Sequence, residues 1–279
     1  MVGGTSGIGQ GIAQYALAQG AKVTIAGRTL RDTLTPSLTY IKVDFNLVSA
    51  SRAFAAALPA STYDFIFLTS GIVPGSKRVE TAEGIEQDMA VSALSRVVLL
   101  EEIAPKLKAD ARVFVWGFPG TAGLMKKAPL EDFNSEVSYH GAFEAAHMRT
   151  VVVNEALVAH HASKCMHIYG LNPGLIATDI RSSLHGGMGS CCGSCLEGCI
   201  GLFNPSVKQY VSKLLPILLS PTPAPKGTSF GQSGKPISPT PELTDPTQVN
   251  TWMEAAGNLV AKASGAASGQ AKGSVMLRE

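Results

Sequence analysis

The first residues whose types and spacing could do chemistry are the glycines near the N-terminus. The segment from Val2 to Gly9 reads Val-Gly-Gly-Thr-Ser-Gly-Ile-Gly and leads into an apolar stretch of helical period. Such turns let the backbone approach a pyrophosphate, whose charge then lies on the N–H groups and dipole of the helix start. Glycines also serve tight turns without a ligand, so the pattern alone leaves both interpretations open. The candidate phosphate-binding residues are Gly3, Thr5, Ser6, Gly7, Ile8 and Gly9.

A cation follows the next apolar run. Arg28 comes just past the expected strand at 22–26. At this place dinucleotide-binding folds that prefer NAD carry an acid for the ribose hydroxyls, and those that prefer NADP carry a cation near the 2′-phosphate. Arg28 therefore indicates NADP(H). The alternative is a solvated arginine at a strand end, since exposed arginines are common.

Alternating strands and helices would position these residues. Short apolar runs predict strands at 22–26, 40–44, 63–68, 112–116 and 166–171. Apolar residues at spacings of three and four predict helices at 7–19, 48–58, 81–107 and 138–162, with a further helix near 205–219. Strand–helix alternation of this kind gives a mostly parallel sheet covered on both faces, so the expected fold class is α/β.

Three further motifs follow the glycine turn. Asp44 ends the run at 40–44, Leu68-Thr69-Ser70-Gly71 follows the next run, and Asn172-Pro173-Gly174 precedes Thr178. In this order they resemble the motifs of the short-chain dehydrogenase/reductase family, over most of the chain. The resemblance implies a doubly wound Rossmann-type sheet and a dinucleotide site. It implies that Asp44 faces the adenine, that Gly71 lies in a cofactor-binding loop, and that Pro173, Gly174 and Thr178 lie beside the nicotinamide.

The positions that carry the family's chemistry depart from its pattern. The resemblance implies a Tyr-x-x-x-Lys helix, a serine after the fifth strand and an asparagine in the fourth helix. Tyr139 matches the tyrosine, but Phe143 stands in place of the lysine, Gly117 and Phe118 in place of the serine, and Ser92 in place of the asparagine. An unassisted tyrosine, with a pKa near ~10, can protonate a nascent alkoxide but is a poor base. We therefore predict that Tyr139 is catalytic and that the reaction is a reduction.

A histidine lies close to this tyrosine in the sequence. His147 is eight residues after Tyr139, two helical turns on, where it would relay a proton, orient the tyrosine or serve the structure only. The alternative for Tyr139 is a helix residue with its hydroxyl toward solvent. The segments 139–158 and 170–176 resemble a divergent fungal subgroup of the family, often found among secondary-metabolite enzymes. That resemblance implies a small hydrophobic substrate that carries a carbonyl group.

Charge and hydropathy bound the partners of the protein. The 279 residues include 23 Lys and Arg against 21 Asp and Glu, for a net charge of +2 without a basic stripe, which argues against nucleic acid. The longest apolar stretch, 214–219, is interrupted by Pro216, so no membrane span is expected. A content of 45% hydrophobic and 16% charged residues leaves apolar surface for a greasy substrate, a homo-oligomer interface or membrane contact. The start without a charged and apolar leader, and an odd number of cysteines, predict a cytoplasmic protein.

The last third of the chain has a different composition. We expect one domain over 1–279, with a lid at about 180–220 and a Pro-rich, partly flexible region at 221–279. Four of the five cysteines fall within 191–199. They could bind Zn²⁺ or carry lipids, but they lack the paired Cys-x₂-Cys spacing of structural zinc sites, so we predict no metal and a small apolar lid surface. From residue 254 onward the tail is either a fraying helix or disordered.

The start of the chain leaves little room for a first strand. Met1 and Val2 alone precede the glycine turn, whereas the family's turn follows a central strand of about 5–6 residues. Whether the fold lacks this strand stays open. We expect either that the given start is shortened or that the protein is poorly stable, because unpaired buried backbone groups cost about 1–3 kcal/mol each.

These patterns together predict an NADP(H)-dependent oxidoreductase that reduces a small hydrophobic carbonyl compound. Two alternatives stay open. One is a catalytically inactive scaffold, and the other is a non-redox isomerase or cyclase that reuses the fold.

Overall fold

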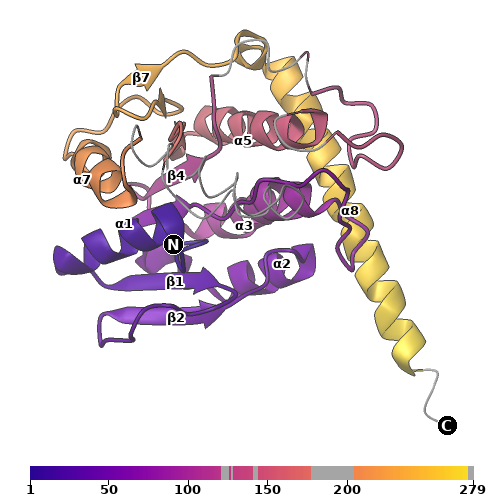
Figure 1. Cartoon of the computed structure of the whole chain (residues 1–279), viewed down its shortest axis with the longest axis horizontal. Helices are drawn as coiled ribbons and strands as arrows, with labels where there is room; N and C mark the ends of the chain where they lie inside the picture. Colours follow the sequence, from indigo (N-terminus) through magenta and orange to yellow (C-terminus); the bar gives the residue numbers. More distant parts are fainter. Residues whose placement is uncertain (121–125, 127, 141–143, 177–203, 276–279) are drawn as a thin grey trace, which may run out of the picture.

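The computed structural model describes residues 1–120, 126, 128–140, 144–176 and 204–275, with 266–275 described in the backbone only. Strands and helices alternate along it (Figure 1). The strands are β1 Val23–Gly27, β2 Leu38–Lys42, β3 Phe65–Leu68, β4 Arg112–Trp116, β5 His167–Leu171, β6 Ser229–Phe230 and β7 Pro236–Ile237. The α-helices are α1 Gly7–Ala18, α2 Val48–Ala57, α3 Ser95–Ile103, α5 Ala145–Ser163, α7 Val207–Leu218 and α8 Pro246–Val275. The shorter helical segments are η1 Ala60–Thr62, the π-helical η2 Met89–Leu94, η3 Ala104–Lys106 and η5 Pro241–Thr244.

The strands form a parallel layer that Met1 and Val2 join in its centre. β1 pairs with β2, and the second sheet runs β3-β4-β5-β6-β7 with only β7 antiparallel. Val2 forms parallel bridges to Ala26 on β1 and to Leu68 on β3, and its N–H donates to the Phe67 carbonyl at 2.9 Å. The predicted α/β fold with a doubly wound parallel sheet is confirmed. In place of a first strand, the described chain has a single bridging residue.

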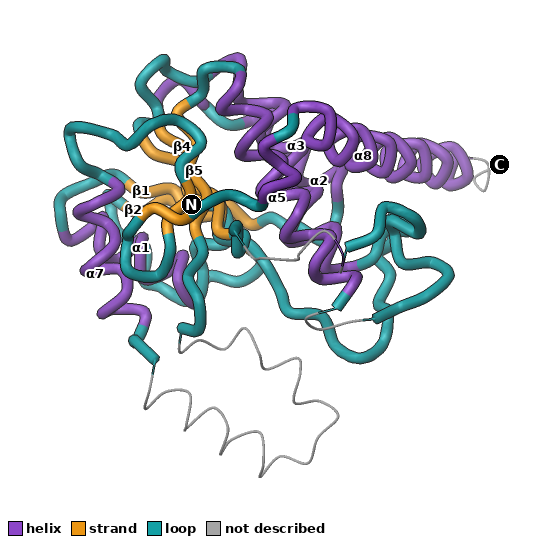
Figure 2. Tube along the Cα trace, turned by 90° about the horizontal axis from the view of Figure 1, so that it is seen from above, coloured by secondary structure: helices purple, strands orange, loops and turns teal. Residues whose placement is uncertain are grey.

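Both faces of the sheet are buried because side chains alternate along each strand. Phe67, Phe114 and Tyr169 lie side by side in register, with ring centroids 5.1 and 5.4 Å apart, and pack toward α1 and α7. Their neighbours on the strands, such as Ile66 and Val113, pack toward α2, α3, α5 and α8. Figure 2 shows the two groups of helices on opposite sides of the strands.

The predicted helix at 81–107 is wrong at its start. Residues 81–86 form a turn in which the Thr81 N–H donates to the Ile85 carbonyl at 2.8 Å, and Glu80 and Glu86 form an antiparallel bridge. Gly84 has a φ of +75°, a left-handed conformation that interrupts a helix. Helical structure begins only at Gln87, and η2 follows Asp88.

The predicted helix at 138–162 also begins too early, because α5 starts at Ala145. The carboxylate of Asp132 accepts hydrogen bonds from the N–H groups of Glu136, Val137 and Ser138, at 2.6 to 3.1 Å. These bonds hold the segment in a turn, since a carboxylate satisfies N–H groups that a helix would otherwise use. Tyr139 therefore lies in a loop, and the helical spacing expected between it and His147 does not exist.

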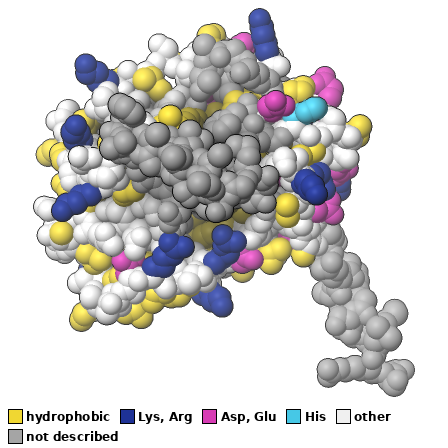
Figure 3. All heavy atoms as spheres, in the orientation of Figure 1, with side chains coloured by type: hydrophobic (Ala, Val, Ile, Leu, Met, Phe, Trp, Pro, Cys, Tyr) yellow, Lys and Arg dark blue, Asp and Glu magenta, His cyan; other side chains and the backbone are white. Residues whose placement is uncertain are grey.

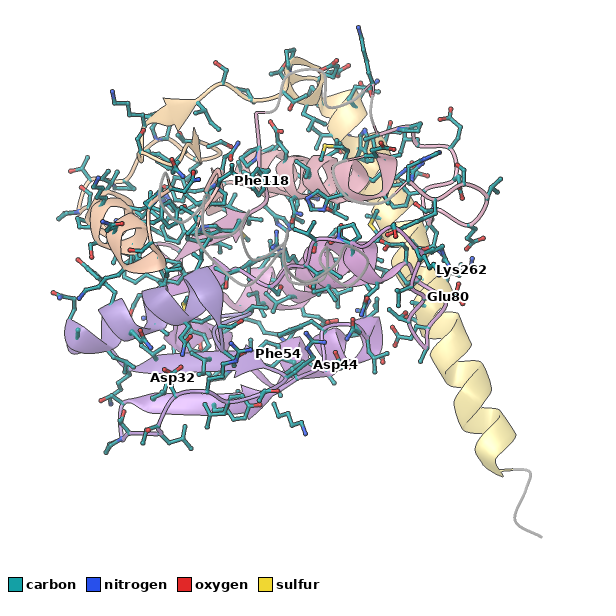
Figure 4. The ribbon with its side chains drawn as sticks, viewed as in Figure 1. Asp32, Asp44, Phe54, Glu80, Phe118 and Lys262 are labelled. Atoms are coloured by element: carbon teal, nitrogen blue, oxygen red, sulfur yellow. The ribbon has the colours of Figure 1, made fainter. Side chains whose placement is uncertain are left out.

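The C-terminal region ends in a long helix. The expectation of no long regular structure at 221–246 agrees with the two-residue strands β6 and β7, and of the two alternatives for the tail the helix is the one observed. α8 packs mainly on α5 and α2, and an ion pair of 2.6 Å joins Lys262 Nζ to Glu136 Oε1. Lys262 is labelled in Figure 4. The predicted lid at 180–220 and the cysteines at 191–199 lie largely outside the described residues; the described part of the lid contains α7.

Candidate active site

A cavity of about 130 Å³ lies at the carboxyl ends of the central strands. Its walls come from the start of α1, the loops after β3, β4 and β5, and one face each of η2–α3 and α5. Ligands bind at this edge in doubly wound sheets, because the loops that follow parallel strands converge there. The lining residues are Ile8, Thr69, Gly71, Ile72, Val73, Ser92, Arg96, Trp116, Gly117, Phe118, His147, Thr150, Val151, Asn154, Pro173, Gly174, Leu175 and Ile176.

The glycine turn beside this cavity is closely packed. Gly3 has a φ of +83°, and a Cβ on it would lie 2.4 Å from the Ser70 nitrogen. A Cβ on Gly9 would lie 2.3 Å from Thr69 Oγ1. Ser6 precedes α1 without a side-chain cap, and the N–H of Gln10 donates to the Ser6 carbonyl at 3.1 Å. The N–H groups of the first helical turn are therefore suited to an anion.

The other predicted cofactor residues occupy three places. Gly71, Pro173 and Gly174 line the cavity together with Ile8 of the glycine turn. Arg28 follows β1 and is exposed, and Asp44 lies just past β2, where its carboxylate accepts from the Asn46 side chain at 2.7 Å (Figure 4). Both strand ends lie at the edge that carries the cavity. Thr178 lies outside the described residues.

Tyr139 does not line the cavity. Its hydroxyl donates to the Gly75 carbonyl at 3.3 Å. Burial, followed by the charges of Glu86 and Asp88, raises the pKa of Tyr139 to about 12. A raised pKa opposes the role of a base still further. The catalytic role of Tyr139 stays a prediction that this location does not favour.

A buried acid–histidine pair forms part of the cavity wall. Nδ1 of His147, on α5, lies 2.7 Å from Oδ2 of Asp88, whose side chain is fully buried. The other carboxylate oxygen of Asp88 accepts from the Ser92 hydroxyl, which itself accepts from the Ile72 N–H at 3.1 Å. Burial alone would lower the pKa of His147, but the hydrogen bond and charge of Asp88 raise it above its ordinary value.

A buried arginine supports the same wall. Arg96 is 2% exposed and donates to the carbonyls of Trp116 and Ser70 and to Asn154 Oδ1. The amide of Asn154 donates in turn to the Ser92 carbonyl at 2.8 Å. Burial lowers the pKa of Arg96 to about 10, which keeps the guanidinium charged at neutral pH. These bonds join the loop ends of β3 and β4 to η2 and α5.

No motif in the sequence predicted a role for Asp88, Arg96 or Asn154, and the role of His147 was open. A signal was present. Asp88, Ser92 and Arg96 recur at spacings of four in a largely apolar stretch, and His147 and Asn154 are among the buried polar residues of α5. Polar residues at helical spacing inside a buried element need partners, and here they are each other's partners.

Three observations concern other partners. Figure 3 shows Lys and Arg side chains at separate places on one face, with acidic side chains among them. Among the described residues, no helix combines the length and apolar character needed to span a bilayer. No group of three or more His, Cys, Asp or Glu in the described ranges is placed to hold a metal ion.

The fold, the glycine turn and the cavity define an α/β protein of the doubly wound class. No family model matches the chain. An uncharacterized oxidoreductase of Saccharomyces cerevisiae is 34% identical over 276 residues, which cover 94% of this chain and 87% of the relative.

Solved structures share the fold. A short-chain dehydrogenase family protein from Francisella tularensis superposes with a TM-score of 0.61 at 16% identity, covering 84% of this chain and 95% of that one. The NADPH-bound carbonyl reductase from chicken fatty liver gives 0.56 at 14% identity, covering 85% and 96%. The chain belongs to the short-chain dehydrogenase/reductase family and is an oxidoreductase of that type.

Proposed function

We propose that the protein is an NADP(H)-dependent reductase of a small hydrophobic carbonyl compound. The observation that carries the proposal is the largely apolar cavity beside the glycine turn, at the strand edge where doubly wound folds bind their ligands. A neighbour in fold is a carbonyl reductase with bound NADPH, which agrees with this reaction class.

The glycine turn fits the cofactor's phosphates. Gly3 and Gly9 leave no space for a side chain, and the uncapped first turn of α1 presents N–H groups to an anion. We infer that Gly3, Thr5, Ser6, Gly7, Ile8 and Gly9 hold the pyrophosphate. Gly71, Pro173 and Gly174 line the cavity where the nicotinamide would lie.

Arg28 supplies the preference for NADP(H). It is exposed just past the end of β1. Asp44 lies past the neighbouring strand and would face the adenine. When bound, NADPH supplies the hydride that reduces a carbonyl carbon.

The lining of the cavity selects the substrate. Val73, Trp116, Phe118, Val151 and Ile176 provide an apolar surface, which excludes water and favours a hydrophobic molecule. The few polar groups in the wall can orient one oxygen atom. A cytoplasmic location, a homo-oligomer and a role in secondary metabolism stay predictions.

The experiment titrates NADPH and NADH against wild-type protein and Arg28→Ala. Charge-assisted bonds are worth about 1.5–3 kcal/mol, so the variant should lose about ten- to a hundred-fold in NADPH affinity and keep its NADH affinity. Lys22→Ala, at the opposite end of β1, is the matched control. Equal wild-type affinities for both cofactors contradict the NADP(H) assignment.

Turnover is tested by NADPH oxidation against a panel of hydrophobic ketones and aldehydes. We expect at least one carbonyl compound to be reduced. Binding of NADPH without oxidation favours the non-redox isomerase or cyclase, and the absence of binding favours the scaffold.

A further inference from the structure

The lining of the cavity contains basic side chains but no acid. Among its described lining residues, Arg96 on α3 and His147 on α5 are basic, and none carries a carboxylate. Asp88 is not part of the lining, has no exposed surface and pairs with His147 at 2.7 Å. A cavity lined by one sign of charge favours a ligand of the opposite sign, so this lining indicates an anion.

The guanidinium of Arg96 is held at the cavity wall by uncharged acceptors. Its Nη1 donates to the Trp116 carbonyl at 2.7 Å and to Asn154 Oδ1 at 2.8 Å, and its Nη2 donates to the Ser70 carbonyl. Trp116 and Asn154 line the cavity themselves. Within the described part of the chain, the buried Nε of Arg96 has no hydrogen-bond partner. The three acceptors do not neutralise the guanidinium, although the charge of Asp88 also acts on it.

Gly71 leaves space beside this guanidinium. A Cβ on Gly71, which lines the cavity, would lie 3.7 Å from Arg96 Nη2 and 3.5 Å from Ser92 Oγ. The Ser92 hydroxyl gives its proton to Asp88, so it is not the donor at this place. Nη2 carries two N–H groups, of which the Ser70 carbonyl takes one. An oxygen atom of a ligand beside Gly71 therefore meets a guanidinium edge.

The rest of the lining indicates which anion this is. Val73, Trp116 and Val151 make the wall largely apolar, and the volume of about 130 Å³ suits a small molecule. A carboxylate matches the planar fork of a guanidinium and forms paired, charge-assisted hydrogen bonds with it. A phosphate of the dinucleotide is the other source of anionic oxygen, but the glycine turn already accounts for the pyrophosphate. A small apolar carboxylate is therefore the better fit.

We propose that Arg96 recognises a carboxylate in this cavity, so that the substrate of the reductase is a small apolar oxo acid. The proposal rests on the proposed function, because the oxo group is the carbonyl that is reduced. The carboxylate pairs with the guanidinium beside Gly71, and the apolar part of the substrate lies against Val73 and Val151. Arg96 is a specificity-determining residue, and the carboxylate passes through the reaction unchanged.

A binding measurement tests the recognition without turnover. Benzoate and benzamide have nearly the same shape and differ in charge, and both are titrated into the full chain by ligand-observed NMR. Wild-type protein should bind benzoate about tenfold or more tightly than benzamide, because the bonds to benzoate are charge-assisted on both sides. Equal affinities for the two compounds overturn the proposal.

Two variants of Arg96 and one control assign the preference to this residue. Arg96→Gln should bind the two compounds equally, and Arg96→Lys should keep part of the preference, since an ammonium has the charge without the fork. The matched control is Arg149→Gln. Arg149 is also 2% exposed, on α5, but it bonds to the Pro129 carbonyl and lies outside the lining, so its loss should leave the preference intact. Full preference for benzoate in Arg96→Gln overturns the proposal.

Gly71→Ala tests the same place while leaving the bonds of Arg96 in position. The added Cβ would meet Ser92 Oγ and Arg96 Nη2 at ordinary contact distances, so the variant should melt within a few degrees of the wild type. The methyl group hinders the approach of a carboxylate to Nη2. Benzoate affinity should fall about tenfold, whereas benzamide affinity should change less than about threefold. Unchanged benzoate affinity in Gly71→Ala overturns the placement of the carboxylate, even if the variants of Arg96 do not fold.

A titration with NADPH separates the two sources of anionic oxygen. If the guanidinium serves a substrate carboxylate, Arg96→Gln should change NADPH affinity less than about threefold. A loss of about tenfold or more in NADPH affinity, without a benzoate preference in the wild type, assigns Arg96 to a cofactor phosphate and overturns the proposal.

Turnover distinguishes this proposal from the function on which it rests. Benzoylformate and acetophenone present the same ring and ketone, and only the first has a carboxylate. Wild-type kcat/KM should be about tenfold or more higher for benzoylformate, and Arg96→Gln should remove the difference. Reduction of both compounds at equal kcat/KM overturns this proposal and leaves the reductase standing. Selective binding of benzoate without oxidation of NADPH by any carbonyl compound overturns the reductase and leaves the carboxylate site.

Discussion

Restoring a side chain at Gly117 should destabilise the protein rather than repair it. Gly117 stands where the family resemblance implies a serine, so Gly117→Ser is the obvious attempt at repair. A Cβ at this position would lie 2.6 Å from Cβ and 3.1 Å from Cγ of Asn154. Ordinary carbon–carbon contacts are about 3.5–4.0 Å, so Asn154 must move by about 1 Å.

The cost follows from what Asn154 holds. It accepts from Arg96 at 2.8 Å and donates to the carbonyls of Ser92 and Thr150 at 2.8 and 2.7 Å. Overpacking alone costs about 1–3 kcal/mol, and one lost bond to a buried guanidinium adds about 1.5–3 kcal/mol. We expect both Gly117→Ala and Gly117→Ser to lower the free energy of unfolding by about 2.5–6 kcal/mol.

The assay is thermal and urea unfolding of both variants. At about 2–4 °C per kcal/mol, the melting temperature should fall by about 5–24 °C. The control is Gly257→Ala on α8, where an added Cβ meets nothing within 4 Å, and which should stabilise the helix by about 0.5–1 kcal/mol. If Gly117→Ala has the same melting temperature as the wild type, Asn154 can move away from the added Cβ without loss of stability, which contradicts the prediction.

Two further predictions concern buried acids. Burial, then the charge of Asp88, raises the pKa of Glu86 to about 7, so the folded state holds its proton more tightly than the unfolded state does. This contribution to stability is complete below the pKa of the unfolded state and is lost as the pH rises through about 7. Urea unfolding should therefore show a free energy of unfolding that falls from about pH 5 to about pH 8. The fall should be less steep in Glu86→Gln. The carboxylate of Glu155 accepts one hydrogen bond from Gly120 and two from Thr240, at 2.6 to 3.1 Å. In urea unfolding, Glu155→Ala should therefore lower the free energy of unfolding by about 3 kcal/mol, and Glu155→Gln should lower it less. Equal stability of the two variants would contradict this prediction.

The sheet could be predicted because its signal is local. The strand predictions lie within two residues of β1 to β5, and the 112–116 prediction matches β4 at both ends. Neighbours such as Val113 and Phe114 are both apolar because the sheet is covered on both faces. A continuous apolar run bounded by turn residues then marks the strand without alternation.

The helix starts could not be predicted from apolar period. Asp132 holds three N–H groups before α5, and Gly84 adopts a left-handed conformation before η2. Neither effect changes the spacing of apolar residues. The error moved Tyr139 onto a helix and hid the position of His147.

The sequence predicted the position of the glycine turn but not the polar contacts of the cavity wall, and the role of the turn toward a cofactor stays a prediction. The glycine turn is one continuous segment, so its residues can be recognised together in the sequence. The contact between Asp88 and His147 spans 59 residues, and that between Arg96 and Asn154 spans 58. Such pairs arise where helices meet in the fold, and their polar residues can be read from the sequence only as groups that need partners.

The central claim is that the protein transfers hydride from NADPH to a carbonyl carbon. In the most direct test, the wild-type protein is incubated with the panel of hydrophobic ketones and aldehydes and with NADPH that is deuterated at the transferring position of the nicotinamide. The masses of the products are then measured by mass spectrometry. We expect an alcohol one mass unit heavier than the alcohol made with ordinary NADPH, formed in an amount equal to that of NADP⁺. An alcohol without deuterium, or a rearranged product with NADPH unconsumed, would contradict it.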